Sequence, residues 1–170
     1  MPSPVSSLQS LVCALAGLAL AAPPASALTC LPWAPANAYQ EAAGAQDVFN
    51  VLAGTLQFDG SLLPQSHAED PNDTPPLTKI PAQLTGHMLM QDGFTKPVEV
   101  AVELEVECLG PWCTSPPPGQ NYLVFARQQG PRLIVRAGVC GGFLFDDIPE
   151  VRQEVLDCHQ GKACVPARLD

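Results

Sequence analysis

Apolar and polar residues alternate along residues 98–107, which read VEVAVELEVE. Every second position from Val98 to Val106 is a valine or a leucine, and the positions between them are four glutamates and one alanine. This period of two predicts a strand with one buried face and one face in water. Residues 82–90 are the expected antiparallel partner, with Asp92-Gly93 in the connecting turn.

The register of this predicted hairpin follows from the requirement that its apolar side chains share one face. A slip of one residue would exchange the two faces, so we predict that Met88 lies opposite Val98. This register needs a connection of odd length, such as a three-residue loop with a glycine bulge. It places His87 opposite Glu99 on the solvent face, where the carboxylate would favour the charged imidazolium.

Three further segments have the composition of strands, and two have that of helices. The strands are expected at residues 51–59, 122–126 and 133–139, and the helices at residues 37–46 and from Asp147 onward. Gly54 in the first strand is expected to be a bulge or a point of close approach. Asn37, with Gln40 in a capping box, and Asp147 are the expected helix caps.

Residues 60–81 interrupt the regular pattern. The segment is rich in proline and has no regular period, which predicts a surface loop. Together the segments predict a mainly β domain, namely a small OB-like five-stranded barrel with a helix near each end.

The N-terminal residues form a separate segment. Residues 11–22 are almost wholly apolar but fall short of the roughly 20 residues that span a bilayer. Ala25-Ser26-Ala27 then fits a signal-peptidase site. We expect residues 1–27 to be a cleaved signal peptide and residues 28–170 to form one periplasmic or secreted domain without a membrane span. A lipoprotein with Cys30 as the lipid-bearing residue is the alternative.

The cysteines beyond the predicted cleavage site are even in number, which predicts a disulfide framework in an oxidising compartment. Cys108 with Cys113, and Cys158 with Cys164, are close enough in sequence to form two short-range disulfides. Cys108 and Cys113 do not have the Cys-x-x-Cys spacing of a redox pair.

The charge of the chain is strongly acidic, with a formal net charge of −9. Such a chain repels phosphate backbones, so we expect no nucleic-acid partner. The acidity favours either simple solubility or a basic partner.

The order of these elements carries a family resemblance. The resemblance rests on three features, namely Cys30 near the mature start, the strand at 51–58, and YLVFA at 122–126 followed by a strand that ends at Cys140. In this order the chain resembles the netrin-type module of the tissue inhibitors of metalloproteinases. The resemblance implies an exported OB-like/netrin-type domain over residues 28–170. It also implies a Cys30–Cys140 disulfide, because an N-terminal cysteine of that family pairs with one deep in the domain.

The start of the mature chain bears on whether it inhibits a metallopeptidase. The resembled inhibitors begin with Cys-x-Cys, and the free amine of the first cysteine binds the zinc of the protease. Here Cys30 is followed by Leu31-Pro32-Trp33, and the expected cleavage leaves Leu28-Thr29 before it. Metallopeptidase inhibition is therefore an alternative function that requires Cys30 to be the mature N-terminus.

Metal-binding patterns are sparse. His67, His87 and His159 lack the spacing of a zinc site. His87 with Met88 and Met90 has the ligand types that suit copper, although on a strand His87 would point away from both methionines. A small copper-handling periplasmic protein is the second alternative, and the leading prediction is that the protein has no metal and no cofactor.

No nucleophile–base pair or paired-carboxylate motif stands out, so no catalytic residue is predicted. Trp33 and Trp112 each follow a cysteine and a proline, and on stapled loops they are candidate contacts for a partner. Packing against the neighbouring disulfide is the alternative role for both. The sequence thus predicts an exported, non-enzymatic binding module for an unknown protein partner in the envelope or the extracellular space.

Overall fold

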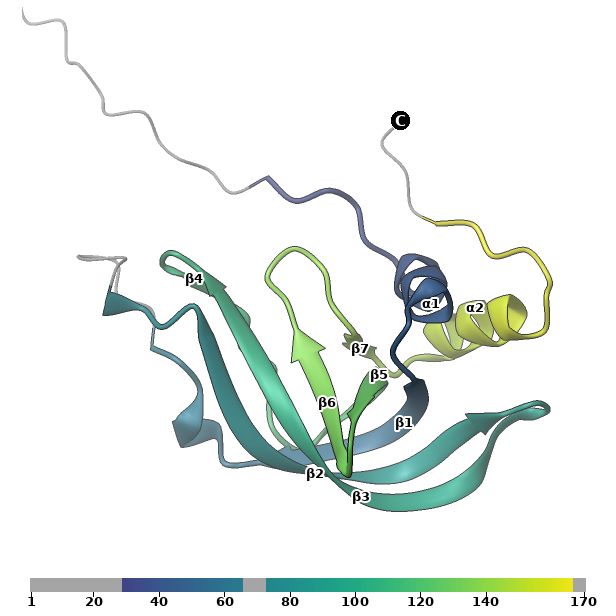
Figure 1. The fold of residues 1–170 in the computed structure, drawn as a ribbon, viewed down its shortest axis with the longest axis horizontal. Helices are drawn as coiled ribbons and strands as arrows, with labels where there is room; N and C mark the ends of the chain where they lie inside the picture. The colour runs from purple at the N-terminus through teal and green to yellow at the C-terminus, as the bar shows by residue number, and fades with distance from the viewer. Residues whose placement is uncertain (1–28, 66–72, 167–170) are drawn as a thin grey trace, which may run out of the picture.

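The computed structural model describes residues 29–65 and 73–166, and over these residues the protein is mainly β (Figure 1). The elements are α1 (Pro35–Gly44), β1 (Phe49–Phe58), the 3-10 turn η1 (Gly60–Leu62), β2 (Leu77–Met90), β3 (Gly93–Leu109), β4 (Trp112–Cys113), β5 (Gln120–Gln129), β6 (Arg132–Ala137), β7 (Leu144–Asp146) and α2 (Pro149–His159). The predicted signal peptide and His67 lie outside the described residues.

Five of the strands form a ring. The strand order β1–β2–β3–β6–β5 returns to β1, because β1 pairs with both β2 and β5. β3 and β6 run parallel, whereas the other neighbours in the ring are antiparallel. β4 continues from β3 as a short hairpin, and β7 lies beside β5.

The core has two parts, one inside the ring and one outside it. Leu52, Leu84 and Leu104 are among the fully buried side chains of the inner cluster. The outer cluster lies between the ring and the two helices, which lie side by side (Figure 1), and includes Leu123 and Phe125 of β5. β5 is therefore buried on both faces, which explains its unbroken apolar run YLVFA.

The β2–β3 hairpin has a different register from the predicted one. Glu99 lies opposite Thr85, and His87 lies opposite Pro97, so the predicted pairing of His87 with Glu99 is wrong. The ladder is displaced by two residues from the prediction. Because side chains alternate with a period of two, an even displacement keeps the apolar residues on the inner face.

A bulge near the turn is the reason for the different register. The ladder shifts between Met88 and Leu89, and Met90 pairs with Gly93 across a two-residue loop. The prediction places one additional residue in a three-residue loop. In the structure this additional residue is accommodated as a bulge within the ladder. Such a bulge changes the register without any signal in the turn sequence itself.

Proline, rather than a polar cap, marks the start of each helix. α1 and α2 begin at Pro35 and Pro149, whose fixed φ angle suits the first helical position. The predicted caps are therefore wrong. Asn37 is the third residue of α1, where its Oδ1 accepts from the Ala34 N–H at 2.9 Å. Asp147 precedes the start of α2 and forms an ion pair with Arg152.

α1 receives a cap from the other helix. The N-cap residue Ala34 has no side-chain oxygen that could accept from the first turn, but the Ala36 N–H donates to Glu154 Oε1 of α2 at 2.8 Å. We expect Glu154→Ala to lower the free energy of unfolding by about 1–2 kcal/mol, because an N-terminal donor of α1 loses its acceptor. Urea denaturation measures this loss. Glu154→Gln keeps an acceptor oxygen and should lose much less; equal losses in the two variants would contradict the capping role.

The predicted loop over residues 60–81 is shorter than expected. η1 occupies Gly60–Leu62, and β2 already begins at Leu77, so residues 77–81 belong to a strand. Pro81 is accommodated because β1 reaches β2 only as far as Ala82. A strand that lacks a second neighbour tolerates a residue without an N–H.

Candidate functional site

Within the residues that the structure describes, three disulfides link segments that lie apart or close short loops. They join Cys30 to Cys140, Cys108 to Cys113 and Cys158 to Cys164. These are the three pairs that the sequence analysis predicts. The first ties the N-terminal segment to the loop between β6 and β7, the second closes the β3–β4 hairpin, and the third ties the C-terminal segment to α2.

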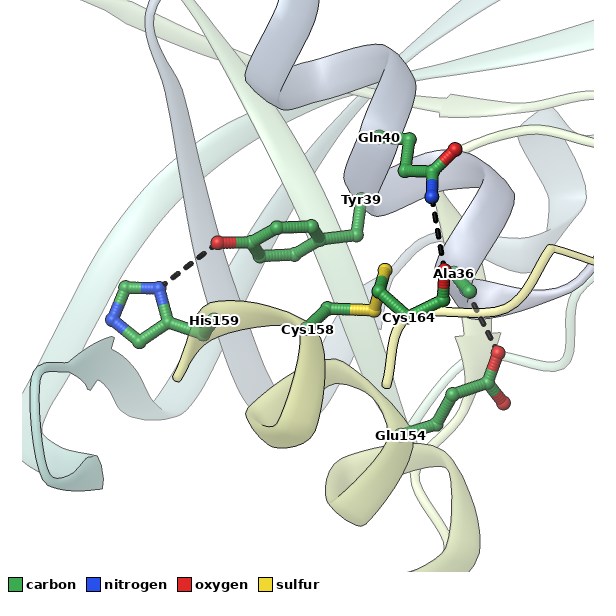
Figure 2. Close-up of a disulfide and its surroundings, with 7 residues drawn as sticks. All are labelled: Ala36, Tyr39, Gln40, Glu154, Cys158, His159 and Cys164. Carbon is green, nitrogen blue, oxygen red and sulfur yellow. Dashed lines mark hydrogen bonds between the residues drawn. A yellow bond between two sulfur atoms is a disulfide. The ribbon is translucent and has the colours of Figure 1, made fainter. Parts of the chain in front are cut away.

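The third disulfide lies where α1 contacts α2 (Figure 2). Gln40, which was expected in a capping box, instead donates from Nε2 to the Cys164 carbonyl at 3.0 Å. The Tyr39 hydroxyl lies 3.2 Å from His159 Nδ1. Burial raises the pKa of Tyr39 above its usual value, so this hydroxyl is protonated at neutral pH. These contacts fix α1, and with it the segment that precedes α1.

Trp33 packs beside the first disulfide. Its Nε1 donates to the Gly142 carbonyl at 2.9 Å, and a Cβ on Gly141 would lie 2.8 Å from its Cγ. Gly141 also has a φ of 138°, which disfavours any other residue at this position. Trp33 therefore packs against the loop that this disulfide holds, and its contact with a partner stays a prediction.

Trp112 lies at the tip of the β3–β4 hairpin, where it is 41% exposed. It lies opposite Leu109, which is 48% exposed, and opposite residues in a ladder share one face. Leu77 lies opposite Glu107 on the same outer face and is also exposed. We call Leu77, Leu109 and Trp112 the hydrophobic ridge.

Two adjoining hollows lie beside the hydrophobic ridge, with volumes of about 490 and 300 Å³. Leu77 lines the larger hollow, and Leu109 and Trp33 line the smaller one. The residues that line both are Glu41, Glu107, Arg136 and Phe143. We call the two hollows together the groove. It joins the hydrophobic ridge to Trp33, so the two predicted tryptophans belong to one end of the ring.

Glu103, Glu105 and Glu107 of β3 form ion pairs with cations of the neighbouring strands. Arg136 of β6 donates to Glu107 at 2.5 Å. Lys79 of β2 lies 3.0 Å from both Glu103 and Glu105, and its hydrogen bonds to them raise its pKa. These three glutamates therefore form a half-buried face with paired charges. Sequence reasoning missed the role of Arg136, because the parallel pairing of β6 with β3 joins segments far apart in the chain.

The copper-type residues do not converge. His87 is exposed opposite Pro97, whereas Met88 packs against the inner cluster. In the part of the chain that the structure describes, no group of three or more His, Cys, Asp or Glu side chains could hold a metal ion. This end of the ring presents exposed apolar side chains beside paired charges.

The described helices include none that is long and apolar enough to cross a membrane. Comparison with known proteins adds no relative, since no family model, curated protein or solved structure matches this chain.

Proposed function

We propose that this protein is an exported, non-enzymatic binding module that contacts a protein partner through the hydrophobic ridge and the groove. The observation that carries the proposal is the ridge itself. Leu77, Leu109 and Trp112 are each at least 41% exposed. Leu109 and Trp112 belong to the disulfide-closed β3–β4 hairpin, and Leu77 belongs to the neighbouring strand β2. Exposed apolar residues gathered next to a hollow are typical of interaction sites, and tryptophan is frequent among the residues that dominate binding energy.

The disulfides support a role in binding. Cys108–Cys113 closes the hairpin that carries Leu109 and Trp112, and Cys30–Cys140 holds the loop behind Trp33. A surface that is already ordered in the free protein loses less conformational entropy on binding. Three disulfides are also compatible with the proposed periplasmic or extracellular location.

The strand order supports the proposed OB-type fold. A ring of five strands with one parallel pair, β3 with β6, and a helix near each end agrees with the netrin-type resemblance. The Cys30–Cys140 disulfide adds to that agreement. Metallopeptidase inhibition is a second candidate function, and the exposed position of Cys30 next to this end of the ring favours it. N-terminal sequencing tests it: a mature chain that begins before Cys30 would exclude the mechanism of the resembled inhibitors.

Affinity capture with matched variants tests the proposed function. The bait is the mature protein, incubated with the periplasmic or extracellular fraction of the producing cells, and the variants are Leu109→Ser and Trp112→Ser. Met90→Ser is the control, because Met90 is a 40% exposed side chain at the other end of β2.

We expect the wild type and the Met90→Ser control to retain the same partner in equal amounts. Each ridge variant should bind that partner at least about 30-fold more weakly, the effect of losing a residue worth about 2 kcal/mol. All variants should keep the wild-type unfolding midpoint, because the substituted side chains are exposed. A ridge variant that still binds the partner with full affinity would refute the proposal.

A further inference from the structure

We propose that the groove selects a basic segment of the partner, in which a lysine or arginine stands next to an aromatic or aliphatic residue. This inference rests on the proposed function and adds the chemistry of the partner. It combines the apolar and carboxylate side chains that line the groove with the charge of the whole chain.

Apolar side chains line part of the larger hollow. Phe49 of β1, Ile134 of β6 and Phe143 line it together. Its volume of about 490 Å³ lies within the range of about 300–1,000 Å³ that is common for binding pockets. The hollow therefore offers apolar contact to a partner side chain, mainly through the half-buried Phe49, because Ile134 and Phe143 are almost fully buried.

The groove has more carboxylates than cations. Four carboxylates line it, from Glu41, Asp47, Glu105 and Glu107, against two guanidinium groups, from Arg127 and Arg136. Both arginines lie against carboxylates of the groove: Arg136 lies 2.5 Å from Glu107, and Arg127 lies 3.6 Å from Asp47.

Glu41 is the carboxylate available to a partner. It is exposed on α1, lines both hollows, and forms no ion pair with the residues that the structure describes. Glu105 forms an ion pair with Lys79, whose Nζ lies 3.0 Å from the Glu105 Oε1. Lys79 itself does not line the groove. A cation placed beside Glu41 would gain attraction there, whereas an anion would be repelled.

The net charge of −9 acts in the same direction. A potential of one sign steers partners of the opposite sign toward the surface and raises their association rate. An acidic partner would meet repulsion both at long range and at Glu41. The whole-chain charge and the local charge therefore favour the same class of partner.

Two synthetic peptides test the inference by NMR titration of the folded wild-type protein. One is a capped Lys-Lys-Phe-Leu-Lys amide, and the other carries glutamate in place of each lysine. We expect the basic peptide to shift the amide signals of Trp33, Arg136 and Phe143, and to bind more weakly as salt is added. The acidic peptide should leave these signals unchanged.

Glu41→Lys and Glu99→Lys are the matched variants, because they change the net charge equally and both positions are exposed. Glu99 lies on β3 outside the groove. Glu41→Lys should weaken binding of the basic peptide by about fivefold or more, and Glu99→Lys by no more than about twofold.

Three outcomes would overturn the inference. The first is an acidic peptide that binds as tightly as the basic peptide, or more tightly. The second is an equal loss of affinity for the basic peptide in Glu41→Lys and Glu99→Lys. The third is a titration in which the basic peptide shifts no amide signals, or only signals outside the groove. The proposed function is tested apart from this. If Leu109→Ser loses the captured partner while Glu41→Lys retains it with unchanged affinity, the binding role stands and the basic segment is refuted.

Discussion

Loss of the Cys30–Cys140 disulfide is expected to lower the free energy of unfolding by about 4–5 kcal/mol. The bridge joins residues separated by 110 positions, so without it the unfolded chain gains far more conformational freedom than the folded one. The change is the double variant Cys30→Ala with Cys140→Ala, and urea denaturation measures its effect. Trp33 should also lose part of its packing, because the bridge holds the loop between β6 and β7 against which its side chain packs.

The short bridge between Cys158 and Cys164 provides the control. It spans only 6 positions, so the matched double alanine variant should lose about 2 kcal/mol. If removing this bridge costs as much as removing the long one, chain entropy is not the main source of the stability that the Cys30–Cys140 bridge contributes.

Gly54→Ala is expected to destabilise the protein by about 3 kcal/mol, as a severe case of overpacking. Gly54 of β1 lies opposite Gly86 of β2. A Cβ on Gly54 would lie 2.3 Å from the Thr85 carbonyl oxygen and 2.6 Å from the Gly86 Cα. These are backbone atoms, so no side chain can move aside, and the two strands of the ring would have to separate. Thermal and urea denaturation measure the loss.

Gly44→Ala is the matched control for this substitution. Gly44 ends α1, and a Cβ there would meet no atom within 4 Å. Alanine at Gly44 should therefore leave stability unchanged or raise it by up to about 1 kcal/mol. A Gly54→Ala variant as stable as Gly44→Ala would contradict the close approach of β1 and β2.

The sequence predicts those features that depend on local pattern. The alternation in residues 98–107 identifies β3. It also identifies which side chains face the inside of the ring, although the register with β2 differs by two residues from the predicted one. Gly54 was expected to be either a bulge or a close approach, and it is a close approach within an unbroken ladder. The helix starts were missed because Pro35 and Pro149 determine them, rather than the polar residues that follow or precede.

The candidate site could be predicted only in part, because its residues meet through pairing between distant segments. Trp112 is predicted from its place after Cys108 and Pro111 on a stapled loop, which is a local signal. Leu77 joins Leu109 and Trp112 only through the register of β2 with β3. The groove needs Arg136 beside Glu107, which follows from the parallel pairing of β6 with β3. No local periodicity reveals a pairing of that kind.

Hydrogen–deuterium exchange on the complex with the captured partner tests the central claim most directly. We predict slower exchange on binding at residues 107–113, which carry the exposed hairpin tip, and at residues 136–143 beside the groove. Exchange at residues 88–94, in the β2–β3 turn at the other end of the hairpin, should stay the same. Slower exchange confined to that turn or to α2, with residues 107–113 unchanged, would contradict binding through the hydrophobic ridge.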